Sequence, residues 1–146
     1  MRHEAFLDAV DAARVVAAIR EAESRCRAEI RVHVTDEPVA DVEAAAVVTF
    51  ERLRMTDTAE RNGVLIYLAP ETQRFAVLGD RGIDGASEPG FWSAVTATMQ
   101  ALFREGRFTD GVVAGVLAVG EQLARTFPRR EGDTDRNELP DAVSRD

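Results

Sequence analysis

The chain has 146 residues, a length that fits one domain with one hydrophobic core. Its formal net charge of −8 argues against non-specific binding to nucleic acid or to anionic lipid, because such proteins usually carry an excess of base. Apart from two histidines its basic residues are all arginines, which excludes chemistry that needs a lysine, such as a Schiff base or a Walker-type phosphate loop.

The N-terminal residues and the apolar runs predict a cytoplasmic protein. The first residues lack the apolar segment of a signal peptide. No run approaches the ~20 apolar residues that span a bilayer, so we expect no direct membrane insertion. The only cysteine, Cys26, cannot form an internal disulfide. It falls on an apolar stripe, which favours a buried side chain over a reactive thiol.

Apolar spacing in the first third of the chain predicts a helix, a strand and a second helix. Residues 11–28 place apolar side chains every three or four positions, which indicates one buried helical face. Residues 29–35 alternate strictly, with Arg31 and His33 on one face, which is typical of a half-buried strand. Helical spacing returns at residues 39–55, after Pro38. The inner stripes of the two helices comprise Val15, Ile19, Ala22 and Cys26, then Val42, Ala46, Phe50 and Leu53.

The middle of the chain predicts a hairpin. Residues 63–69 are apolar on both faces, which is typical of a central strand that is covered on both sides. The short turn at 70–73 leads to a strand at 74–78, and a connection of this length predicts antiparallel pairing. A glycine-rich loop with little periodicity follows at 79–90.

Two further helices are predicted, at 90–104 and from about Thr109 to 126. Thr109 is a suitable N-cap for the second helix, and Gly106 is suited to end the first. Gly111 and Gly115 are four residues apart in the second helix, so we expect a close approach to a neighbouring element there.

The C-terminal residues differ in composition from the rest. Pro128 ends the last predicted helix, and residues 129–146 are charged and poor in apolar side chains. We therefore expect a domain at residues 1–128 and a flexible charged tail at 129–146. The order α-β-α-β-β-α-α predicts an α/β fold. Its small mixed sheet combines a parallel β-α-β unit with an antiparallel hairpin, and helices cover both faces.

Four local segments, in this order and spacing, resemble the TPM domain family. They are residues 28–30 (Ala-Glu-Ile), 61–66 (Arg-Asn-Gly-Val-Leu-Ile), 79–84 (Gly-Asp-Arg-Gly-Ile-Asp) and 103–111 (Phe-Arg-Glu-Gly-Arg-Phe-Thr-Asp-Gly). The likeness covers roughly residues 11–128 and is to the short soluble bacterial branch. It implies a Rossmann-like α/β/α sandwich, divalent-cation binding, acid phosphatase activity, and a protein partner that could be membrane-associated.

The predicted topology brings acidic side chains to one edge of the sheet. If the first two strands are parallel, Glu29 and Asn62 begin at the same edge, and Asp80 returns to it at the end of the third strand. Oxygen-only clusters suit Ca²⁺ or Mg²⁺ better than zinc or copper. The alternative is a solvated acidic rim that binds ions only loosely. The predicted ligands are Asp57, Asn62, Asp80 and Asp84, with Glu29, Glu60 and Glu88 as additional candidates.

The resemblance and these residues leave three candidate functions. The preferred one is a divalent-cation-binding module that engages a partner and has no strong catalytic activity. The alternative is a metal-assisted acid phosphatase for phosphate monoesters, in which Arg81 would meet a phosphate oxygen. The third is a structural accessory protein without a site. A cysteine-phosphatase loop is excluded because Val32 stands where that loop needs an arginine.

Overall fold

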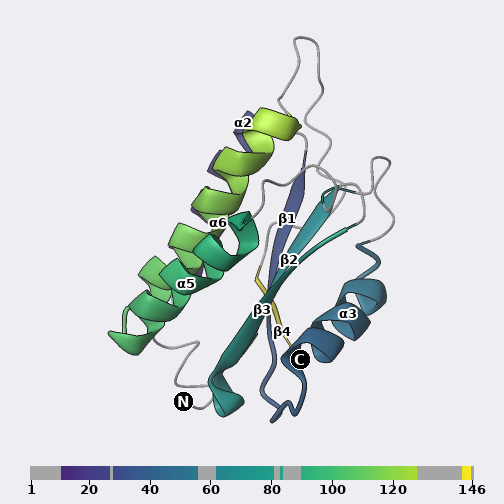
Figure 1. The fold of residues 1–146 in the computed structure, drawn as a ribbon, viewed down its shortest axis with the longest axis vertical. Helices are drawn as coiled ribbons and strands as arrows, with labels where there is room; N and C mark the ends of the chain where they lie inside the picture. Colours follow the sequence, from purple (N-terminus) through teal and green to yellow (C-terminus); the bar gives the residue numbers. More distant parts are fainter. Residues whose placement is uncertain are drawn as a thin grey trace.

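The computed structural model describes residues 11–26, 28–55, 62–80, 83, 90–127 and 143–145. Helices cover both faces of a central sheet, with α2, α5 and α6 on one side and α3 on the other (Figure 1). This arrangement confirms the predicted α/β sandwich. In chain order the elements are α2 (Ala12–Arg25), β1 (Glu29–Val34), α3 (Val42–Arg52), β2 (Gly63–Ala69), the 3₁₀ turn η1 (Pro70–Thr72), β3 (Arg74–Gly79), α5 (Phe91–Arg104), α6 (Phe108–Thr126) and β4 (Ser144–Arg145).

The sheet is mixed, as predicted, and its strand order is β3-β2-β1-β4. β1 and β2 are parallel, whereas β2 and β3 form the antiparallel hairpin. The short strand β4 pairs with β1 in parallel, with Ser144 opposite His33. The sequence assigned 129–146 to a flexible tail. Of that segment the structure describes 143–145, and these residues include a strand. A strand of two residues is too short to leave an alternating pattern in the sequence.

Aspartate side chains cap two of the helices. Asp11 accepts a hydrogen bond from the amide of Arg14 at the start of α2, and Asp41 accepts one from the amide of Ala44 at the start of α3. The cap at Asp41 explains why α3 begins later than the predicted residue 39. The predicted N-cap at Thr109 is wrong, because α6 already begins at Phe108.

The interior has two apolar layers, one on each face of the sheet. The larger lies under α2, α5 and α6, and the smaller lies between the sheet and α3. Glycines allow the helices of the larger layer to approach closely. A Cβ atom built on Gly115 would lie 2.5 Å from the sulfur of Met99, and one on Gly120 would lie 2.4 Å from Cβ of Ala22. The close approach predicted at Gly115 is therefore confirmed.

β1 is more deeply buried than its alternating sequence suggests. Only Arg31 is half-buried, whereas His33 is 1% exposed and Glu29 is 5% exposed. The His33 ring stacks on Tyr67 at 5.7 Å between ring centroids, and its Nδ1 lies 2.7 Å from Oγ of Ser144. The prediction of a half-buried strand was wrong, because β2 and β4 supply neighbours for the polar face.

Candidate functional site

The backbone joins three strand ends at one edge of the sheet. Parallel pairing sets Glu29 opposite Gly63, and the amide of Glu29 donates to the carbonyl of Asn62 at 3.3 Å. The amide of Asp80, just after β3, donates to the carbonyl of Gly63 at 2.8 Å. Glu29, Asn62 and Asp80 therefore come together as the predicted topology required.

These three residues are buried. Asn62 is 2% exposed, Glu29 is 5% exposed and Asp80 is 6% exposed. Burying polar groups in this way costs free energy unless partners compensate them. The two carboxylates and one carboxamide offer only oxygen atoms of the kind that Ca²⁺ and Mg²⁺ prefer. The chemistry of the donors thus fits a hard divalent cation.

The remaining predicted site residues lie outside the described part of the chain. Ile83 is the one described residue between Asp80 and Gly90. Its side chain is fully buried, and its amide donates to the carbonyl of Asp80 at 2.9 Å, which anchors Ile83 beside the edge. No group of three or more His, Cys, Asp or Glu side chains among the described residues could hold a metal. The described part therefore supplies a partial ligand set. The residues outside it are Asp57, Glu60, Arg81, Asp84 and Glu88.

A row of polar side chains along β1 was not predicted as a feature of the site. Arg31 and His33 follow Glu29 on the same face of the strand. Nε of Arg31 is buried without a hydrogen-bond partner among the described residues, and burial lowers the pKa of Arg31. A guanidinium nevertheless stays protonated at physiological pH, so a positive charge lies two residues from Glu29. The alternation in the sequence revealed this row, but solvent was expected to cover it.

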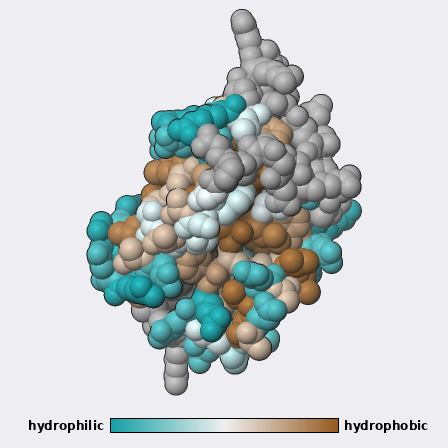
Figure 2. Space-filling view, viewed as in Figure 1, coloured by the Kyte–Doolittle hydropathy of each residue, from teal (hydrophilic) through white to brown (hydrophobic). Residues whose placement is uncertain are grey.

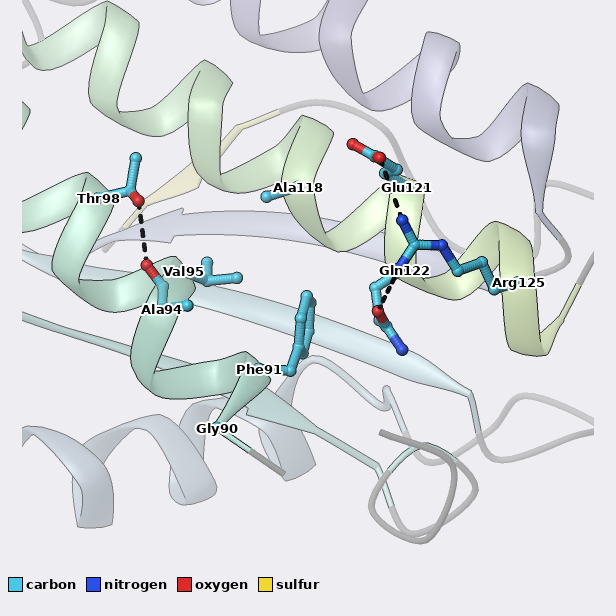
Figure 3. Close-up of a pocket in the computed structure, with 9 residues that line it drawn as sticks. All are labelled: Gly90, Phe91, Ala94, Val95, Thr98, Ala118, Glu121, Gln122 and Arg125. Carbon is cyan, nitrogen blue, oxygen red and sulfur yellow. Dashed lines mark hydrogen bonds and ion pairs between the residues drawn. The ribbon is translucent and has the colours of Figure 1, made fainter. Parts of the chain in front are cut away.

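A groove of about 430 Å³ runs between α5 and α6 (Figure 3). Arg125 lines it, but its guanidinium already donates to Glu121 and to Oε1 of Gln122, both at 3.3 Å. Figure 3 shows Phe91 and Val95 of α5 opposite these polar residues. The positive charge in this groove is compensated locally, so the groove has little capacity to attract an anion.

An apolar pair is exposed on the outer face of α3. Val47 is 45% exposed and Val48 is 62% exposed. Hydrophobic side chains reach the surface in this region of the space-filling view (Figure 2).

No described helix combines the length and the apolar character that crossing a membrane requires.

Comparison with known proteins assigns the family. The family model of the TPM domain matches residues 1–122, so the chain belongs to the TPM domain family. The NMR structure of BA42, from the psychrophilic bacterium Bizionia argentinensis, is 36% identical. The match covers 94% of this chain and 95% of BA42, with a TM-score of 0.84. No protein with a curated function shows significant similarity.

A second solved structure shares the fold. It is the N-terminal domain of a protein from P. gingivalis, with 24% identity and a TM-score of 0.61. The match covers 76% of this chain and 72% of that domain. At this level of identity the likeness shows the fold alone.

Proposed function

We propose that this TPM domain is a binding module for Ca²⁺ or Mg²⁺ without strong catalytic activity. Glu29, Asn62 and Asp80 form the described part of the proposed site. The observation that carries the proposal is their burial at the junction of three strand ends, where each is at most 6% exposed. A solvated acidic rim would leave its carboxylates exposed, so the burial of these side chains favours a preformed binding site. Asp57 and Asp84 are the further proposed ligands, and Glu60 and Glu88 are additional candidates.

A divalent cation would neutralise negative charge at the sheet edge. Ca²⁺ takes six to eight oxygen ligands, and Mg²⁺ usually keeps several waters. The described residues offer fewer donors than either ion needs, so the proposal requires ligands from the predicted loop residues or from water. Arg31 lies on the same face of β1, two residues from Glu29, and places a positive charge near this edge.

Isothermal titration calorimetry with Ca²⁺ and with Mg²⁺ tests the proposal. The wild type should give a saturable binding heat, and Asp80→Asn should weaken the affinity at least about tenfold because a charged ligand is lost. Asp36→Asn is the matched control, since Asp36 is exposed and follows the other end of β1. The absence of binding heat in the wild type, or equal affinity in the wild type and Asp80→Asn, would contradict the proposal.

The phosphatase alternative has less support than cation binding. Hydrolysis of a phosphate monoester needs a nucleophile or a metal-held water, and positive charge for the phosphoryl oxygens. Arg81, which the sequence assigns to that second role, lies outside the described residues. Turnover of a generic phosphate ester at acidic pH tests this alternative. Loss of activity in Asp80→Asn would support the phosphatase alternative. Unchanged activity in the double variant with Asp80→Asn and Asp84→Asn would show that catalysis does not occur at this site.

The protein partner and the cytoplasmic location stay predictions.

A further inference from the structure

A second concavity lies at the end of the sheet opposite the proposed cation site. Its volume is about 550 Å³, and it is lined by the β2–β3 turn, the last turn of α5 and the first residue of α6. β2 runs from Gly63 at the cation edge to Ala69 at this concavity. At about 3.3 Å per residue the two ends are roughly 20 Å apart, so the two sites cannot share a small ligand. The volume is typical of small-molecule sites.

Two arginines without acidic partners line this concavity. Arg74 comes from β3 and Arg104 from α5, and neither forms an ion pair or a side-chain hydrogen bond within the described part of the chain. No Asp or Glu is among the described residues that line it. In contrast, several exposed arginines elsewhere are paired with carboxylates, as in Arg25 with Glu21 at 2.9 Å. Within the described residues, a chain with a net charge of −8 thus keeps two positive charges without carboxylate partners at one concave surface.

Aromatic rings form the apolar part of the same concavity. Phe75 and Phe103 meet edge to face, with ring centroids 5.3 Å apart, and Phe108 lies 6.3 Å from Phe103. All three rings are half-buried, so each keeps part of its surface accessible. Gln73 adopts a left-handed backbone conformation, with φ of 55°, immediately before Arg74. A non-glycine residue held in that region is a strained feature of the kind found at binding sites.

We propose that this concavity binds a small organic anion that carries an aromatic ring. The two guanidinium groups would hold the anionic group, and the phenylalanine rings would pack against the aromatic body of the ligand. Charge complementarity and the meeting of arginines and aromatic rings at one concave surface support this ligand class. Binding here is independent of the proposed cation site. A carboxylate and a phosphoryl group share this chemistry, and the experiment separates them.

Amide chemical shifts of ¹⁵N-labelled protein provide the test, with phenylphosphonate and benzoate as the two probes. Either probe should shift the amide signals of Gln73, Arg74 and Arg104 in a saturable manner, and the tighter one identifies the anionic group. Inorganic phosphate and benzyl alcohol, which carry only the charge or only the ring, should bind at least about tenfold more weakly.

Charge-removing variants complete the test. Arg74→Gln and Arg104→Gln should each weaken binding of the aromatic probe about tenfold or more, because a charge-assisted hydrogen bond is lost. Arg52→Gln, on α3, removes the same charge away from the concavity and should leave the affinity unchanged. The proposal would be overturned by unsaturable shifts with both probes, by equal affinity in all three variants, or by shifts centred on Asn62 and Asp80.

Discussion

The amide of Asp80 donates a 2.8 Å hydrogen bond to the carbonyl of Gly63, and this bond ties the end of β3 to the start of β2. Because both atoms belong to the backbone, the bond does not need the carboxylate of Asp80 and stays available with any residue except proline at position 80. Changing the carboxylate of Asp80 therefore tests ligand binding while it leaves the joint between the strands in place.

The contact between α2 and α6 should depend on Gly120. A Cβ atom at this position would lie 2.4 Å from Cβ and 3.0 Å from Cα of Ala22, so Gly120→Ala forces the two helices apart. We expect a net loss of about 1–2 kcal/mol in the free energy of unfolding, even though alanine has a helix propensity better by up to about 1 kcal/mol. Urea denaturation measures this loss.

Gly115→Ala provides the internal comparison. Its added methyl group would meet the side chain of Met99, which can move, rather than a neighbouring backbone. The loss in unfolding free energy should therefore be smaller than for Gly120→Ala. An equal or larger loss for Gly115→Ala would show that the packing of α5 on α6 is less adaptable than the geometry indicates.

The pairing of β4 with β1 should depend on Ser144. Its Oγ lies 2.7 Å from Nδ1 of His33 and donates to the carbonyl of Val32 at 3.3 Å. Ser144→Ala should lower the free energy of unfolding by about 1 kcal/mol, because hydrogen bonds at a buried imidazole are removed. Ser24→Ala is the control, since the hydroxyl of the exposed Ser24 donates to the carbonyl of Glu21 within α2. An unchanged stability in Ser144→Ala would mean that β4 contributes little to the fold.

Asp110 should titrate below the usual aspartate range. The side-chain hydrogen bond from Arg14 lowers the pKa of Asp110 most, and the one from Arg107 lowers it further. A lowered folded-state pKa stabilises the protein above the unfolded pKa of about 3.9, and that contribution disappears as the pH falls through the folded pKa. NMR titration should show the pKa of Asp110 rising in Arg14→Gln. The stability difference between wild type and Asp110→Asn should be present near pH 7 and should vanish in acid. A pKa that does not change in Arg14→Gln would contradict this assignment.

Much of the fold follows from local patterns in the sequence. The run at 63–69 is apolar on both faces, and β2 is indeed buried along its whole length. The spacing of Val15, Ile19 and Ala22 also matches the buried face of α2. These predictions succeeded because a buried helical stripe leaves a periodic pattern, whereas a strand buried on both faces leaves a short continuous apolar run.

Features that depend on long-range contacts could not be predicted in this way. His33 has Tyr67 and Ser144 as neighbours in the sheet. Ser144 is more than a hundred residues away, and its two-residue strand has no pattern in the sequence. The start of α6 was misplaced because the side chain of Thr109 accepts a hydrogen bond from the amide of Asp11 instead of capping its own helix. For the site, topology alone brought Asn62 and Asp80 to one edge, whereas their burial required the structure.

The most direct test of the cation site is to locate the ion on the protein. Amide chemical shifts of ¹⁵N-labelled protein should be followed during titration with Ca²⁺ and, separately, with Mg²⁺. Saturable shifts should be centred on Glu29, Asn62 and Asp80, and they should be absent in Asp80→Asn and retained in Asp36→Asn. Weak shifts spread over exposed acidic residues such as Glu51 and Glu121, with none at the sheet edge, would contradict the proposed cation site.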